Sequence, residues 1–188
     1  IITAAVLKLF PKPVGHQTAW VSVKDPQAAL HLLNHGLALA GNNLSGFELC
    51  QKFGLSLVEK YQSHISLPFK LQHPWYVLLE VTSGRWQKDA EDVMESIIGG
   101  AIEQGFIDDG VLASSLSQRD QFWAIREALS ESQKFEGGSI KHDISVPVNV
   151  IPEFIFEGER AAQSIVPNAR LCCFGHMGDG NLHFNVSQ

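Results

Sequence analysis

The sequence predicts an α+β fold in which an antiparallel sheet is covered by helices on one face. Helix-like and strand-like segments alternate along the chain, but hairpin-like pairs of strands occur among them, which favours antiparallel pairing. The helical segments repeat their apolar residues with a period near 3.6, whereas residues 139–148 and 182–186 alternate with a period of two. Of the 188 residues, 45% are hydrophobic and 18% are charged, as is typical of a globular core.

The first half of the chain is expected to contain three strands and three helices. Residues 1–10 form an apolar run that ends at Pro11 and Pro13, and proline cannot donate to a strand ladder. The pair Asp25-Pro26 is typical of a helix start, with the aspartate as N-cap and the proline at the first helical position. The expected strands are residues 1–10, 18–23 and 75–81, and the expected helices are residues 26–39, 47–61 and 87–104.

The second half continues with shorter strands around two helices. Ser117 is the expected N-cap of the first of these helices. In residues 139–148, Ile140 and Ile144 fall on one face of a strand while Lys141 and Asp143 fall on the other. The expected strands are residues 110–113, 139–148, 170–175 and 182–186, and the expected helices are residues 117–132 and 150–165.

Charge and composition exclude several classes of protein. A formal net charge of −6 argues against a surface for nucleic acid or anionic membrane, and no apolar run reaches the roughly 20 residues of a membrane helix. Cys50, Cys172 and Cys173 cannot all pair, and packed, reduced thiols are expected in an intracellular, cytoplasmic protein. The chain opens inside an apolar run without methionine, so we expect a piece of a longer protein from which a targeting segment could have been removed.

The segment HMGDGNLHFN, residues 176–185, brings two histidines to neighbouring strand ends. His176 precedes a glycine-rich turn, and His183 projects from the last strand on the same side as Asn185, opposite Leu182 and Phe184. Two imidazoles in this arrangement can converge on one metal ion, and Asn185 could bind a substrate beside it. The same letters also fit an ordinary hairpin with solvated histidines, and the spacing leaves both interpretations open.

A second candidate site lies in the helix that contains FWAIREALS. Arg126 and Ser130 are one turn apart on a face that is separate from the apolar one. A guanidinium matches a carboxylate in shape, a hydroxyl can bind a further oxygen, and Lys141 could add positive charge. The alternative is a solvated helix in which Arg126 pairs with Glu127 or Asp143.

Several segments together carry a resemblance to a known family. HMGDGNLHFN resembles the signature of the C-terminal domain of FAD-linked oxidases in the vanillyl-alcohol oxidase superfamily. The resemblance continues over ITAAVLKLFPKP, LSGFELCQKFGLSLV, WYVLLEVTSG, FWAIREAL and IKHDISVPV, which together span most of the chain. The chain looks most similar to the branch of D-2-hydroxyglutarate dehydrogenases and D-lactate dehydrogenases. This resemblance implies a ferredoxin-like antiparallel sheet, FAD as cofactor and a divalent metal, zinc.

The resemblance also implies roles for individual residues. His176 and His183 would be two metal ligands, while the third ligand and a catalytic histidine would lie downstream of the chain. Residues 1–188 would then be a truncated substrate-binding domain without a catalytic residue of its own, and the FAD-binding domain would be absent. Arg126, Ser130 and Lys141 would hold the distal carboxylate of the substrate, and relatives often have threonine where this chain has Ser130.

The resulting hypothesis is an FAD-dependent dehydrogenase that oxidises a D-2-hydroxy acid, such as D-2-hydroxyglutarate, to the 2-oxo acid. Asn185 would bind the substrate near the metal, and the 188-residue chain alone is expected to be inactive. One alternative is a D-lactate or glycolate dehydrogenase. Another is a non-catalytic ferredoxin-like module that binds a metal or a partner. An unpaired sheet edge beside residues 182–186 would favour a homodimer.

Overall fold

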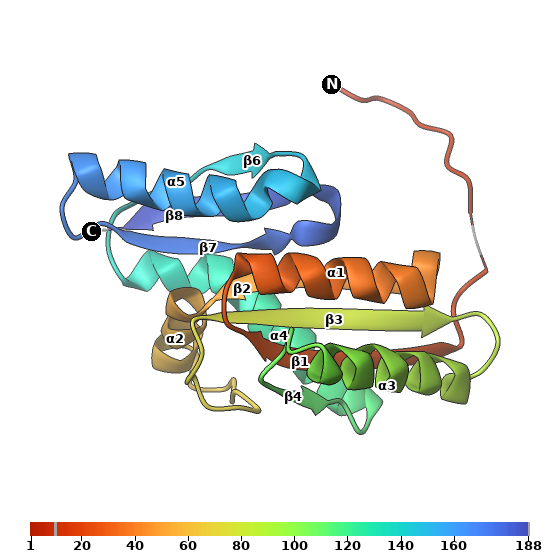
Figure 1. Ribbon diagram of the computed structural model, residues 1–188. Helices are drawn as coiled ribbons and strands as arrows, with labels where there is room; N and C mark the ends of the chain where they lie inside the picture. Colours follow the sequence, from red (N-terminus) through yellow and green to blue (C-terminus); the bar gives the residue numbers. More distant parts are fainter. Residues whose placement is uncertain (10, 188) are drawn as a thin grey trace.

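The computed structural model describes residues 1–9 and 11–187 (Figure 1). The strands of this part of the chain are β1 (Gly15–Val23), β2 (Leu44–Gln51), β3 (Trp75–Ser83), β4 (Asp109–Leu112), β5 (Ser139–Ile140), β6 (Asp143–Ser145), β7 (Arg170–His176) and β8 (Asn181–Ser187). The α-helices are α1 (Pro26–Ala40), α2 (Lys52–Tyr61), α3 (Gln87–Glu103), α4 (Leu116–Ser132) and α5 (Ile151–Ile165). Two short 3-10 helices matter for the site, η2 (Gln133–Phe135) and η4 (Met177–Asp179).

All strands join one antiparallel sheet in the order β4-β1-β3-β2-β7-β8-β5, and β6 also pairs with β8. The part β4-β1-β3-β2, with α1 and α3 as its connecting helices, has the βαββαβ order of a ferredoxin-like unit. The hairpin β7-β8 extends this unit at β2. Only three residue pairs form the seam between them: Glu48↔His176, Leu49↔Gly175 and Cys50↔Phe174.

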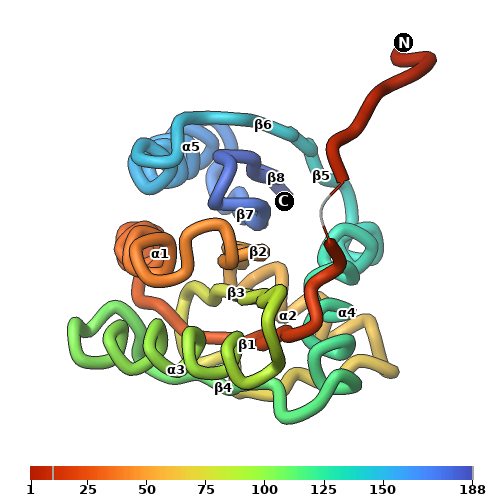
Figure 2. The backbone as a smooth tube through the Cα atoms, turned by 90° about the vertical axis from the view of Figure 1, so that its right-hand side faces the viewer, coloured from red at the N-terminus to blue at the C-terminus, as the bar shows by residue number. Residues whose placement is uncertain are grey.

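The sheet has an apolar core on each face, because successive side chains of a strand point to opposite sides. Ala19 and Val21 of β1 pack with α1, α3 and α5, whereas Trp20 between them packs with α2 and α4. Figure 2 shows the sheet along its edge, with α1 and α3 on one side and α4 on the other. The site described below lies on the face that α4 covers.

The predicted class is confirmed. The sheet is antiparallel, and α1 and α3 of the ferredoxin-like unit lie together on one face. The helices are not restricted to that face, however, since α2 and α4 cover the opposite one. The reason is that α2 and α4 lie outside the crossover connections of the unit and carry their own apolar residues, among them Leu55 and Phe122, against the second core.

Four local predictions were wrong. Residues 1–9 are exposed and form no strand, and Phe10, the last residue of that predicted strand, lies outside the described residues. The helix expected over residues 47–61 is the strand β2 followed by α2, and the strand expected over residues 139–148 is divided into β5 and β6. The N-cap of α4 is Ser115, whose side chain accepts from the Gln118 N–H. β8 is paired with β5 and β6 at Asn181, Leu182, His183, Val186 and Ser187, so the open edge that would favour a homodimer is covered at these positions.

Candidate functional site

The site is centred on Glu48, a carboxylate in the middle of the sheet. Glu48 lies in β2, directly opposite His176 of β7, and its side chain is only 2% exposed. One carboxylate oxygen, Oε2, accepts a hydrogen bond from Arg126 Nε at 2.7 Å. The other, Oε1, pairs with Nδ1 of the His176 ring. Both oxygens therefore hold a predicted site residue.

A carboxylate at this position needs both partners. The period of two puts Glu48 on the same face as Cys50, toward α4 and the second apolar core. Removing an ionised group from water is strongly unfavourable unless it is paired and hydrogen-bonded. Arg126 neutralises the charge, and His176 occupies the second oxygen.

Arg126 is buried on the inner side of α4, and only one of its guanidinium nitrogens, Nε, donates a hydrogen bond to a described residue. The side chain is 10% exposed, and its guanidinium carbon lies 5.0 Å from the centre of the Phe174 ring. Its two terminal nitrogens make no hydrogen bond to any described residue. Arg126 does not pair with Glu127 or Asp143, the partners expected for a solvated helix. The Nε side of the guanidinium is therefore held by Glu48, and the two terminal nitrogens could donate to an anion.

His183 lies next to this pair on β8. Its ring is 4.7 Å from the Phe174 ring, centre to centre, and its Nδ1 pairs with the Asp143 carboxylate of β6. His176 and His183 thus share one arrangement: each ring is bound to a carboxylate through Nδ1. A carboxylate at Nδ1 stabilises the tautomer that leaves the Nε2 lone pair available, which is how metal-binding histidines are commonly oriented.

Asn185 is buried and already engaged. Its side-chain N–H donates to Gln133 Oε1 at 2.9 Å, and its oxygen accepts from the His142 backbone N–H at 3.1 Å. Gln133 begins η2, directly after α4. Asn185 therefore ties the end of α4 to β8, and one of its N–H groups remains for a ligand.

Ser130 and Lys141 are both exposed, and no hydrogen bond or ion pair to a described residue joins either side chain to Arg126 or to the two histidines. Ser130 is on α4 one turn after Arg126, and Lys141 is in the connection between β5 and β6. Burial raises the pKa of the Cys172 thiol to about 12, and the charge of Lys141 opposes this rise. Lys141 is therefore within electrostatic reach of Cys172, whose side chain points to the face covered by α4.

The turn between the two histidines is held tightly. Gly180 has φ +82°, and a Cβ added there would lie 2.0 Å from the Val146 carbonyl oxygen. The Val146 N–H in turn donates to the Gly180 carbonyl at 3.1 Å. Gly180 is thus required by the close approach of Val146, and it directly precedes β8, the strand that carries His183.

Two hollows share Trp123 of α4 in their linings. One, of about 390 Å³, is lined by Glu48 and His176 and also by Leu33 and Leu37 of α1, which covers the opposite face of the sheet. The other, of about 400 Å³, includes Glu80. The Trp123 ring N–H donates to Glu80 Oε2 at 3.0 Å, so the indole is held between the two hollows.

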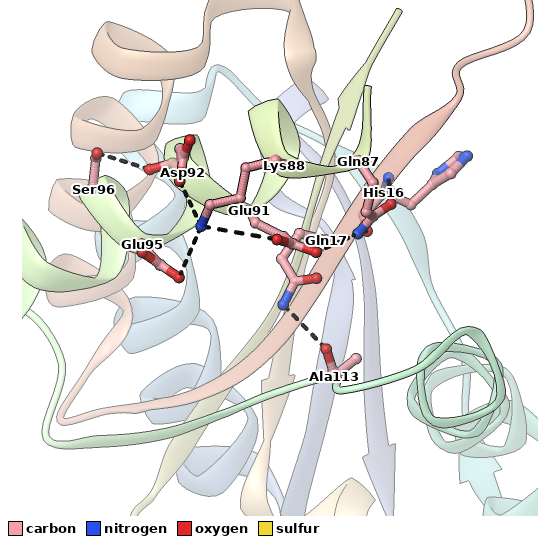
Figure 3. A network of polar contacts seen from close by, with 9 residues as sticks. All are labelled: His16, Gln17, Gln87, Lys88, Glu91, Asp92, Glu95, Ser96 and Ala113. Carbon is pink, nitrogen blue, oxygen red and sulfur yellow. Dashed lines mark hydrogen bonds and ion pairs between the residues drawn. The ribbon is translucent and has the colours of Figure 1, made fainter. Parts of the chain in front are cut away.

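A larger hollow of about 860 Å³ lies at the amino end of α4. Several of its polar side chains are already bound to neighbouring groups, as Figure 3 shows. Gln87 exchanges two hydrogen bonds with the backbone of His16, and Gln17 donates to the Ala113 carbonyl at 3.1 Å. Its lining contains two cations, Lys12 and Arg119, and two carboxylates, Glu91 and Glu95. This balance of charges selects no class of ligand.

Sequence reasoning missed Glu48. The available signal was the alternation of Phe47 and Leu49 with Glu48 and Cys50, which is typical of a strand with two buried faces. This signal was hidden because the apolar run continues into α2. Gln51 at the start of that helix makes no side-chain cap, so nothing in the sequence marks the boundary.

The predicted ligands do not form a complete metal site within the described residues, where no group of three His, Cys, Asp or Glu side chains could hold an ion. No helix of this part of the chain is long and apolar enough to cross a membrane. Cys50, Cys172 and Cys173 are buried and free, as predicted.

Comparison with known proteins gives several relatives over nearly the whole chain. The chain is 29% identical over 187 residues to the mitochondrial D-2-hydroxyglutarate dehydrogenase of Arabidopsis thaliana, covering 100% of this chain and 33% of that protein. It is 34% identical over 185 residues to a mitochondrial protein of Schizosaccharomyces pombe whose name places it among the D-lactate dehydrogenases, covering 94% and 35% of the two chains. The chain thus spans about a third of the length of these relatives.

The fold also matches solved structures. An alkyldihydroxyacetonephosphate synthase superposes with a TM-score of 0.60 at 10% identity, covering 93% of this chain and 36% of that one. This likeness concerns the fold alone. Residues 12–188 match the family described as FAD linked oxidases, C-terminal domain. With nearly the whole chain matched, the chain belongs to this family of C-terminal domains of FAD-linked oxidases.

Proposed function

We propose that this chain is the substrate-binding domain of an FAD-dependent dehydrogenase that oxidises a D-2-hydroxy dicarboxylate, such as D-2-hydroxyglutarate, to the 2-oxo acid. The observation that carries the proposal is the buried Arg126, which is held through Nε by Glu48 while its terminal nitrogens point to no described partner. A guanidinium in this state binds a carboxylate with two parallel hydrogen bonds. The names of several relatives support the choice of substrate.

The residues fit a divalent ion in part. His176 and His183 each have Nδ1 on a carboxylate and Nε2 unbound, which suits two nitrogen ligands of zinc. A catalytic zinc site takes three protein ligands and keeps one position open. The remaining protein ligand would come from outside the described residues.

The chain's own residues would then bind and orient the substrate. Arg126 would hold the distal carboxylate, with the exposed Lys141 and Ser130 adding a charge and a hydroxyl. Asn185 would offer its remaining N–H near the histidines. Two-ended binding of this kind fixes the 2-carbon in one orientation and lowers the entropic part of the barrier. The chemistry supplied by the bound groups is polarisation of the 2-hydroxyl by the ion and hydride acceptance by the flavin.

The test uses the whole protein that contains this domain, reconstituted with FAD and Zn²⁺. Anaerobic addition of D-2-hydroxyglutarate is expected to bleach the flavin absorbance, and a chelator or Arg126→Met should prevent bleaching at the same substrate concentration. Lys134→Met, a change of an exposed cation in η2, serves as the matched control and should bleach as the wild type does. Bleaching by Arg126→Met at unchanged rate and substrate affinity would contradict the proposal.

A D-lactate dehydrogenase is the second candidate, favoured by the relative of S. pombe. Lactate has no distal carboxylate, so its oxidation would not depend on Arg126 in the proposed way. Equal rates on lactate and 2-hydroxyglutarate in the wild type, with lactate oxidation retained in Arg126→Met, would favour this candidate. A binding module without catalysis is favoured if the whole protein retains no flavin.

The compartment and the partners remain predictions. The cytoplasmic expectation competes with a mitochondrial one, because the names of several relatives place them in mitochondria. An open edge at β8 no longer supports the homodimer, since β5 and β6 pair with β8. The electron acceptor is not indicated by the described residues.

A further inference from the structure

The pair of bonds made by Glu48 links two residues to which the proposed function gives different tasks. Arg126 would bind the anionic end of the substrate, and His176 would bind the ion. They come from α4 and β7, and the same buried carboxylate contacts both. Phe174 of β7 also packs against the Arg126 guanidinium, at 5.0 Å. The two bonds of Glu48 add a directional constraint on the relative position of Arg126 and His176.

Glu48 also constrains the chemistry of the His176 ring. A carboxylate can only accept hydrogen bonds, so the nitrogen that faces it must carry a proton. In the neutral ring this leaves Nε2 as the nitrogen with a free lone pair. Glu48 is only 2% exposed, so its two carboxylate oxygens have Arg126 and His176 as partners in place of water.

We propose that Glu48 is the positioning residue of the site, which fixes His176 in its Nδ1–H tautomer and holds Arg126 by its Nε edge. One buried group thereby presents the Nε2 of an imidazole and the outer nitrogens of a guanidinium in a fixed relation. The identity of the bound groups rests on the proposed function. The tautomer of His176 and its dependence on Glu48 do not.

The pair formed by His183 and Asp143 provides an internal comparison. It has the same Nδ1 contact with a carboxylate, but Asp143 is 75% exposed and makes no second ion pair with a described residue. An amide at position 143 is free to rotate and turn its oxygen to His183. A glutamine amide at position 48 cannot rotate in this way, because its oxygen must accept the hydrogen bond from Arg126 Nε. Its NH₂ group therefore faces His176.

The decisive variant is therefore Glu48→Gln. The glutamine oxygen would accept from Arg126 Nε, and its NH₂ would donate to His176 Nδ1. His176 must then carry its proton on Nε2, the nitrogen required for the ion. Asp143→Asn should leave the tautomer of His183 unchanged. In Glu48→Gln with Arg126→Met, the amide is free to rotate and His176 should regain the Nδ1–H form.

The measurement is a long-range ¹H–¹⁵N correlation spectrum of the full protein labelled with ¹⁵N-histidine. Metal is removed with a chelator, and the spectrum is recorded at about pH 8, above the usual imidazole pKa. We expect His176 to carry its proton on Nδ1 in the wild type and on Nε2 in Glu48→Gln. In the double variant we expect the proton on Nδ1 again. An Nε2–H ring in the wild type, or an unchanged ring in a folded Glu48→Gln protein, would overturn the proposal. If the single variant does not fold, the wild type and the double variant decide.

Zn²⁺ binding gives an independent measurement, by competition with a chromophoric chelator. Glu48→Gln is expected to weaken Zn²⁺ binding about 10–100-fold, as for other partners that orient a metal-binding histidine; equal affinity in a folded variant would count against Glu48. The two proposals fail differently. If the tautomers are as expected but the flavin does not bleach, the dehydrogenase proposal is wrong and the role of Glu48 stands. If the flavin bleaches but His176 has the other tautomer, only the proposed role of Glu48 is wrong.

Discussion

At the scale of single residues, the turn that separates His176 from His183 depends on Gly180. Its φ of +82° lies in the left-handed region, where a side chain costs about 1–2 kcal/mol. An added Cβ would also overlap the Val146 carbonyl oxygen, at 2.0 Å. The turn cannot relax without moving Val146, and Val146 follows β6, which carries the carboxylate partner of His183.

Gly180→Ala is therefore expected to lower the free energy of unfolding by more than about 2 kcal/mol. Gly178→Ala is the matched control, because a Cβ at this position meets no atom within 4 Å. The control should change stability by less than about 0.5 kcal/mol. Urea denaturation of both variants measures the difference, and equal midpoints would show that the contact with Val146 is not rigid.

At the scale of elements, the adjacent glycines of α3 have different surroundings. A Cβ on Gly100 would lie 2.7 Å from the His35 ring of α1, whereas a Cβ on Gly99 would meet nothing within 4 Å. The close approach of α1 and α3 thus requires only one of the two glycines. The other weakens the helix without a packing role in the described structure.

Gly99→Ala is expected to stabilise the protein by about 0.5–1 kcal/mol, because alanine loses less backbone entropy in a helix. Gly100→Ala should be less stable than Gly99→Ala by about 1–3 kcal/mol, since the His35 ring must move. Thermal unfolding of both variants tests this order. In a His35→Ala background the two substitutions should become equivalent, and a persistent difference would assign the cost to another contact.

Sequence patterns predicted the elements whose apolar residues repeat with a regular period over many residues. They failed where the structure of a segment depends on a distant segment that packs against it. The 3.6-residue period of α3 and the Asp25-Pro26 start of α1 are local properties, and both are confirmed. Residues 1–9 have the composition of a strand, but composition does not supply a neighbouring strand to pair with. Motifs and resemblance pointed to Arg126, His176 and His183 as candidates, whereas nothing pointed to Glu48, because its burial depends on long-range pairing.

At the scale of the whole molecule, Glu136 connects three distant segments. Its carboxylate accepts hydrogen bonds from Lys60 and Tyr61 at the end of α2 and from Arg170 at the start of β7. These donors, Lys60 first, lower the pKa of Glu136 to about 2. Glu136 thus joins α2 to the added hairpin on the side of the sheet that carries the site.

This depressed pKa has a defined consequence for stability. The folded state favours the carboxylate, so the stabilisation is present above the unfolded pKa near 4.5 and is lost as the pH falls toward 2. Glu136→Gln should be less stable than the wild type at neutral pH, and the difference should decrease over this window. Urea midpoints at several pH values measure it, with the exposed Glu131→Gln as control. A difference independent of pH would exclude the ionised group as its cause.

The narrow seam between β2 and β7 gives the site a mechanical role as well. Three residue pairs join the ferredoxin-like unit to the hairpin there, and Glu48 on one side contacts His176 on the other. A ligand bound to Arg126 and to both histidines would connect α4 to the hairpin β7-β8 across this seam. Its binding energy would oppose local opening of the hairpin, so the amide protons of β7 and β8 would exchange more slowly in the occupied protein.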